Sequence, residues 1–75
     1  MKELVEYIAK SLVNNPEEVK VTEETEEGRV IFRLEVAPED KGKVIGRQGR
    51  VAQAIRALLR VAAVKEDTRA VLEIL

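Results

Sequence analysis

The sequence lacks cysteine, histidine and tryptophan, and Ser11 is its only serine. Without cysteine neither a disulfide nor a thiolate site can form, and this usage is typical of a reducing compartment. Without histidine or cysteine, and with one serine, the chain cannot assemble the usual pairing of a nucleophile with a base. The paired glutamates fall in polar stretches where water surrounds them, so acid–base catalysis is not favoured. No Gly-Lys-Ser/Thr follows a four-residue spacer, which excludes a phosphate-loop NTPase. We therefore expect no enzyme, no cofactor and no metal site.

Aromatic residues and long hydrophobic runs are also scarce. Tyr7 and Phe32 are the only aromatics, too few for the base-stacking platform of RRM or cold-shock domains. We expect Tyr7 to pack on the core face of a first helix and Phe32 in a sheet. The longest apolar run, Val61–Val64, is far shorter than the roughly 20 residues that span a membrane. These features predict a cytoplasmic protein without a membrane partner, folded as one domain over residues 1–75.

Charge is strongly segregated along the chain, although the formal net charge is only −1. Residues 1–40 carry eleven acids and five bases, whereas residues 41–60 carry six bases and no acid. Such a block concentrates positive potential locally, while the acidic remainder repels nonspecific contacts with polyanions. The alternative is a basic helix face that only keeps the protein soluble.

The basic block contains a short glycine motif, Gly46-Arg47-Gln48-Gly49, between an aliphatic segment and a long helical pattern. Two glycines permit a sharp turn and the close approach of another backbone, and Arg47 supplies charge at the tip. The following segment opens a helix whose first N–H groups lack intrahelical acceptors. Arg50 in that first turn opposes the helix dipole, and binding of an external anion explains its presence there. The motif therefore predicts a loop that holds a phosphate backbone.

Hydrophobic periodicity predicts an α+β domain in the order helix, strand, strand, helix, helix, strand. The expected elements are an amphipathic helix over 2–14, a strand over 19–22, an acidic hairpin turn over 23–28, a strand over 30–36, a short helix over 37–45, a long helix over 50–64 and a strand over 69–75.

The two longer helices each have a predicted core face. In the first helix this face carries Leu4, Ile8 and Leu12, with Val5 and Tyr7 beside them. In the long helix the residues that cluster within one arc are Val51, Ile55, Leu58 and Ala62. Gln53, Arg56 and Arg60 fall on the opposite side, where we expect the arginines to lie on a solvated face. Apolar residues in the long helix exceed what a one-sided helix needs. The surplus either contacts another chain or is buried between the sheet and the first helix.

This combination resembles the KH RNA-binding domain, whose G-x-x-G loop clamps about four single-stranded nucleotides. The helix-first order is similar to the type II arrangement. Three segments resemble the small bacterial single-KH proteins of the KhpA type: Val36-Ala37-Pro38-Glu39-Asp40, Gly42-Lys43-Val44-Ile45-Gly46 and Gly49-Arg50. The resemblance implies a mixed three-stranded sheet packed against three helices.

The resemblance also implies a binding site and partners. Gly46 and Gly49 would frame the loop, Arg47 and Gln48 would face the RNA backbone, and the groove would be lined by Lys43, Ile45, Arg50 and Val51. The family implies self-association and pairing with a larger KH-containing protein of the Jag type, which is linked to control of cell elongation and division. It also implies a role as an RNA chaperone or post-transcriptional regulator. Single-stranded DNA remains an open alternative ligand. A protein-interaction or dimerisation module with little RNA affinity is the alternative function.

Overall fold

The computed structural model describes all residues from Met1 to Leu75. The longer elements are α1 (Lys2–Leu12), β1 (Lys20–Glu26), β2 (Arg29–Glu35), α2 (Lys41–Ile45), α3 (Arg50–Lys65) and β3 (Arg69–Ile74). Three short 3₁₀ turns, Pro16–Glu18, Pro38–Asp40 and Arg47–Gly49, join them. The predicted order of helices and strands is confirmed.

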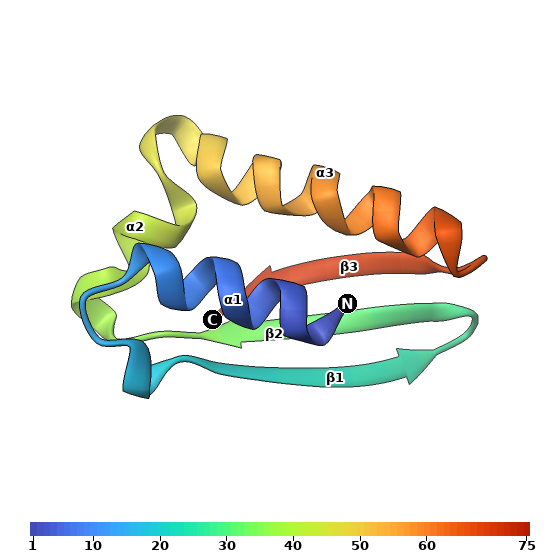
Figure 1. The fold of residues 1–75 in the computed structure, drawn as a ribbon, viewed down its shortest axis with the longest axis horizontal. Helices are drawn as coiled ribbons and strands as arrows, with labels where there is room; N and C mark the ends of the chain where they lie inside the picture. Colours follow the sequence, from blue (N-terminus) through green and yellow to red (C-terminus); the bar gives the residue numbers. More distant parts are fainter.

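The three strands form one mixed sheet in the order β1-β2-β3. β1 pairs antiparallel with β2, with Lys20 opposite Glu35, and β2 pairs parallel with β3, with Arg29 opposite Arg69. Parallel pairing requires a crossover, which α2 and α3 provide. Figure 1 shows α3 running above β3, with α1 alongside it on the same side of the sheet. The mixed sheet and three helices match the predicted fold class.

The core lies between the sheet and the helices. The inward side chains of β2, among them Phe32 and Leu34, are fully buried, and they pack with Val5 of α1 and Leu59 of α3 in one cluster of 12 buried residues. The burial of Phe32 is therefore confirmed, and the alternation of β2 holds except at Ile31, which is buried as well. On the other face of the sheet Arg33 reaches across all three strands, to Glu24 at 3.1 Å and Glu73 at 3.0 Å.

The predicted position of Tyr7 is wrong. The buried residues of α1 are Val5 and Ala9, and Tyr7 is 73% exposed. Tyr7 is two residues from each of them, about 200° round the helix, and therefore points to the opposite side. Of the predicted core residues, Leu4 and Ile8 are only half-buried and Leu12 is exposed.

The predicted core face of α3 is displaced by one residue. The buried residues are Ala52, Ile55, Leu59 and Ala63, so only Ile55 is correct; Val51 and Ala62 are half-buried and Leu58 is 51% exposed. Apolar residues surround most of this helix, so their distribution does not define which part faces the sheet. The small side chains of Ala52 and Ala63 let the helix approach closely.

The acidic hairpin turn is shorter than predicted. β1 continues through the acidic stretch to Glu26, and the turn contains only Glu27 and Gly28, whose φ angles are +48° and +78°. Val21 is the only buried residue of β1, so backbone pairing with β2 rather than side-chain burial holds this part of the strand. The other boundaries differ by one or two residues, except that the short helix divides into a 3₁₀ turn and α2. No helix combines the length and hydropathy needed to cross a bilayer.

Candidate nucleic-acid interface

Gly46 gives the G-x-x-G loop its shape. Its φ of +78° and ψ of 172° belong to a region that essentially only glycine occupies. Its N–H donates to the carbonyl of Gly42 at 2.9 Å, and its own carbonyl accepts from the N–H of Gly49 at 3.1 Å. A Cβ on Gly46 would clash with the side chain of Val51 and lie 2.8 Å from the Val51 backbone nitrogen. Both conformation and space therefore require glycine.

The second half of the loop leads directly into α3. Gln48 and Gly49 both have left-handed backbone conformations, with φ of +58° and +74°. No side chain caps the start of α3, and the N–H of Arg50 donates to the carbonyl of Arg47. The positive end of the helix dipole favours an anion at this position.

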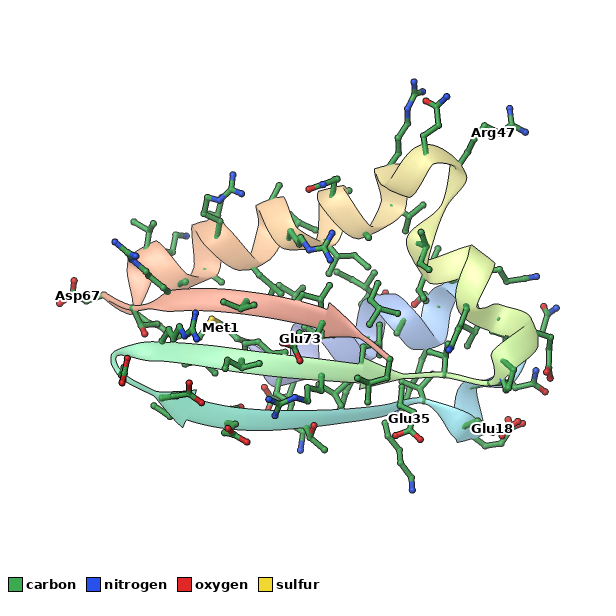
Figure 2. All side chains as sticks on the ribbon, turned by 180° about the vertical axis from the view of Figure 1, so that it is seen from behind. Met1, Glu18, Glu35, Arg47, Asp67 and Glu73 are labelled. Carbon is green, nitrogen blue, oxygen red and sulfur yellow. The ribbon has the colours of Figure 1, made fainter.

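The side chains around the loop are basic and exposed. Arg47 projects from the tip away from the body of the domain (Figure 2), and Lys43 and Arg50 are exposed on α2 and α3 at either side. None of these three cations takes part in an ion pair of the structure. Arg50 donates to Oε1 of Gln48 at 3.2 Å, which holds two polar side chains together. The loop therefore presents exposed positive charge that is not held in ion pairs.

Two aliphatic residues lie beside these charges. Ile45, the last residue of α2, is 39% exposed, and Val51, in the first turn of α3, is half-buried. An exposed aliphatic side chain next to cations can contact the face of a base while the cations contact phosphate. All eight predicted site residues thus lie in one continuous segment, from the end of α2 to the start of α3, comprising Lys43, Ile45, Gly46, Arg47, Gln48, Gly49, Arg50 and Val51.

The role of Asp40, which fixes the position of α2, could not be predicted from the sequence. Asp40 is fully buried and accepts hydrogen bonds from the backbone N–H groups of Asn14 and Asn15, at 3.2 and 3.0 Å, and from Nδ2 of Asn15 at 3.0 Å. Burial acts to raise the pKa of Asp40, but these hydrogen bonds and the charge of Lys43 outweigh it, so the pKa lies below its ordinary value. Asp40 thereby ties the end of α1 to the helix that carries the loop.

Arg56 also differs from its predicted position on a solvated face. It is half-buried, and its guanidinium donates to the carbonyl of Leu72 at 3.4 Å. Leu72 belongs to β3, which lies at the edge of the sheet, so Arg56 covers part of a free strand edge. Arg60 is exposed, as predicted.

The chain contains no group of three or more His, Cys, Asp or Glu side chains that could hold a metal ion. The site therefore offers cations, amide groups, backbone N–H groups and aliphatic side chains. This set is chemically suited to an anionic ligand.

A mixed sheet in helix–strand–strand–helix–helix–strand order, with a glycine loop between the second and third helices, defines a type II KH fold. The family model described as the KH domain of KhpA/KhpB matches residues 2–74. This chain belongs to the KhpA/KhpB KH-domain family, as its sequence motifs predicted.

Individual relatives are similar over essentially their whole length. A Clostridium acetobutylicum protein named RNA-binding protein KhpA is 60% identical, and one of the same name from Clostridium perfringens is 57% identical, each over 100% of both chains. The RNA-binding protein KhpA of Treponema pallidum is 51% identical over 99% of this chain and 92% of its own. No solved structure matches this chain significantly.

Proposed function

We propose that this chain binds single-stranded RNA and that its G-x-x-G loop clamps the RNA backbone. The observation that carries the proposal is the loop itself, where Gly46 packs so closely on Val51 that only glycine fits, and where the basic side chains at the loop take part in no ion pair. The names of the relatives from Clostridium and Treponema support RNA as the ligand. Single-stranded DNA is the competing ligand, and it lacks the 2′-hydroxyl that would distinguish the two.

The chemistry of the loop assigns a role to each residue. Arg47 and Arg50 neutralise phosphate oxygens, the positive end of the α3 dipole adds to this attraction, and Gln48 can donate to or accept from phosphate and sugar. Ile45 and Val51 contact bases in place of the aromatic side chains of other RNA-binding domains. Without stacking, one domain is expected to bind only with about micromolar affinity.

The double variant Arg47→Asp/Gln48→Asp tests this proposal. Both side chains are exposed, so the free energy of unfolding should change by no more than about 0.5 to 1 kcal/mol. Binding of a fluorescein-labelled single-stranded RNA, followed by anisotropy, should become too weak to measure, because two negative charges stand where phosphates are expected. For the parent, log K should fall against log salt with a slope near −2 if Lys43, Arg47 and Arg50 each neutralise one phosphate, at about −0.7 per contact.

The control for this variant is Lys10→Glu/Ser11→Glu, which makes the same change of net charge at two exposed positions of α1. It should bind RNA nearly as well as the parent. A folded loop variant with parental affinity for RNA would make the loop structural and overturn the proposed role of the loop. A parent that binds neither RNA nor DNA would favour the interaction-module alternative. Equal binding of DNA of the same sequence would widen the ligand to single strands in general.

We also propose that the outward face of α3 is an interface. Leu58, Val61 and Val64 are 51%, 59% and 72% exposed. Ala54 and Ala57 of the same helix are exposed as well. Because these side chains are exposed, burial between the sheet and the first helix does not explain the surplus of apolar residues here. Contact with another chain is the other explanation. A second copy of the chain is the proposed occupant, and the KH domain of a larger Jag-type protein is the heteromeric counterpart that the family resemblance implies.

Such an assembly would place two loops on one RNA, and the second contact would benefit from a high effective concentration. This suits a cytoplasmic RNA chaperone or post-transcriptional regulator, with a link to cell shape through the Jag-type partner. Sedimentation should give a concentration-dependent dimer for the parent and a folded monomer for Val61→Glu. A parent that stays monomeric at high micromolar concentration would contradict the interface.

A further inference from the structure

A second cluster of positive charge lies far from the G-x-x-G loop. A pocket of about 360 Å³ opens between the C-terminal half of α3 and the first residues of β3. Three arginines from three different elements line it: Arg29 of β2, Arg60 of α3 and Arg69 of β3. The rest of its lining consists of alanine, valine and threonine residues, without an acid. The pocket is therefore lined by three basic side chains beside small, mostly apolar residues.

These arginines are poorly compensated within the chain. Arg60 and Arg69 have no ion-pair partner, and Arg29 has only Glu26, at 3.6 Å, in a pair whose side chains are both about half exposed. Asp67, in the neighbouring turn, lines an adjoining hollow together with Arg69. Arg29 and Arg69 are also directly opposite each other in the β2–β3 ladder, and like charges in this relation destabilise a sheet. An external anion would remove that repulsion, and a guanidinium is well suited to phosphate.

The pocket is aligned with the loop along α3. Arg56 and Arg60 are four residues apart and therefore lie on the same side of the helix, which faces β3 through the contact of Arg56 with Leu72. At about 1.5 Å per residue, Arg60 lies about 15 Å along the helix from Arg50. Figure 2 shows the two ends of this path, with Arg47 at the loop and Asp67 at the turn beyond α3.

We infer that the Arg29–Arg60–Arg69 pocket is a second phosphate-binding site for the same single-stranded RNA, beyond the nucleotides held by the G-x-x-G loop. The inference rests on the proposed function, because a strand clamped at the loop supplies the phosphates. The site is compatible with the proposed dimer, since Val61 lies about 100° and Leu58 about 200° round the helix from Arg60. Only Val64 borders both surfaces.

The variant Arg60→Gln/Arg69→Gln tests the site with two labelled RNA lengths. One RNA has four nucleotides, the number that a KH loop clamps, and the other has about twelve. For the parent, the longer strand should bind more tightly and with a steeper salt dependence. The variant should bind the longer strand about tenfold more weakly, with a salt slope smaller in magnitude by about 1.4, and the four-nucleotide strand as the parent does. The matched control is Lys10→Gln/Lys20→Gln, which removes two exposed positive charges, one on α1 and one on β1.

The outcomes separate this site from the loop. Parental binding of the longer RNA by Arg60→Gln/Arg69→Gln would overturn the second site while the loop proposal stands. The same is true if the lysine control loses as much affinity, because net charge alone would then explain the effect. Equal loss on both RNA lengths would also overturn it, since the arginines would then act through the loop. If the parent binds neither RNA, the proposed function fails and the second site fails with it.

Discussion

The two edges of the sheet differ in charge, and the difference explains how a domain with a net charge of −1 can present a basic surface. Residues 17–27, which contain β1 and lead into it, carry six glutamates against one lysine. On the other side, β3 lies beneath α3 (Figure 1), and residues 41–60 contain six bases and no acid. Net charge is thus a poor guide to the ligand. The distribution of charged residues over the fold determines which side of the domain attracts a polyanion.

Both edges also need protection from pairing with another strand, and each is protected differently. The exposed glutamates of β1 disfavour the approach of a second strand. At β3 the Arg56 guanidinium occupies the carbonyl of Leu72 instead. A basic side chain therefore protects the β3 edge, and acidic side chains protect the β1 edge. In each case the protecting residues have the charge that predominates on that side of the domain.

The largest effect on stability is expected for alanine at Gly46 in the loop. The comparison is with alanine at Gly28 in the β1–β2 turn, because both glycines have a φ of +78°. Gly28→Ala meets no atom within 4 Å and should lower the free energy of unfolding by only about 1 kcal/mol, the strain of a left-handed alanine. Gly46→Ala adds a clash with Val51 and should cost about 2–4 kcal/mol. Urea denaturation measures both.

RNA titration extends the glycine comparison to function. Gly28→Ala should keep parental affinity, and Gly46→Ala should lose it, because the loop can no longer hold its shape. Should Gly46→Ala unfold the chain, Gly49→Ala gives a milder test, since Gly49 has a φ of +74° and nothing within 4 Å of an added Cβ. Equal stability of Gly46→Ala and Gly28→Ala would show that the loop relaxes around the new methyl group.

The sequence predicted those features that depend on local pattern. The alternation of β2, the order of elements and the glycine loop all follow from residue type and spacing over a few positions. The side of α3 that faces the sheet could not be predicted from the sequence, because alanine and valine surround most of the helix. Tyr7 was assigned to the core by its hydrophobicity, although its position round α1 points it outward.

Long-range polar contacts were the other class of feature that the sequence could not reveal. Asp40 meets Asn14 and Asn15 across about 25 residues of chain, and Arg56 meets Leu72 across 16. The lining of one pocket by Arg29, Arg60 and Arg69 likewise depends on the strand register. Acids and amides at helix ends have local uses as caps, so their sequence positions do not indicate a distant partner.

An intermediate effect is expected at Asp40, the buried acid next to the basic loop. The pKa of Asp40 is lower in the folded chain than its ordinary value of about 3.9, so folding favours the carboxylate. Its contribution to stability is therefore present above about pH 4 and is lost as the pH falls through the lowered folded pKa. Asp40→Asn should lower Tm by several degrees at pH 7, and its difference from the parent should shrink below pH 4.

Glu39→Gln is the matched control for Asp40. Glu39 is exposed and accepts a hydrogen bond from Nδ2 of the same Asn15, at 3.1 Å, so its replacement should change Tm by much less at either pH. Thermal unfolding followed by circular dichroism from pH 7 to pH 2 gives both comparisons. A Tm difference between Asp40→Asn and the parent that is constant with pH would mean that the charge of the carboxylate does not contribute.

The smallest expected effect lies on the acidic side, where Glu17→Gln/Glu23→Gln removes two exposed charges that have no ion-pair partner. Stability should stay within about 0.5 kcal/mol of the parent, as for ordinary surface changes. If the acidic side acts only by repelling RNA at a distance, affinity should rise by no more than about twofold at low salt. The gain should vanish near physiological salt, where the Debye length is about 8 Å. A larger gain that persists at high salt would mean that RNA contacts β1 directly, and the division of the domain into a binding and a repelling edge would then be wrong.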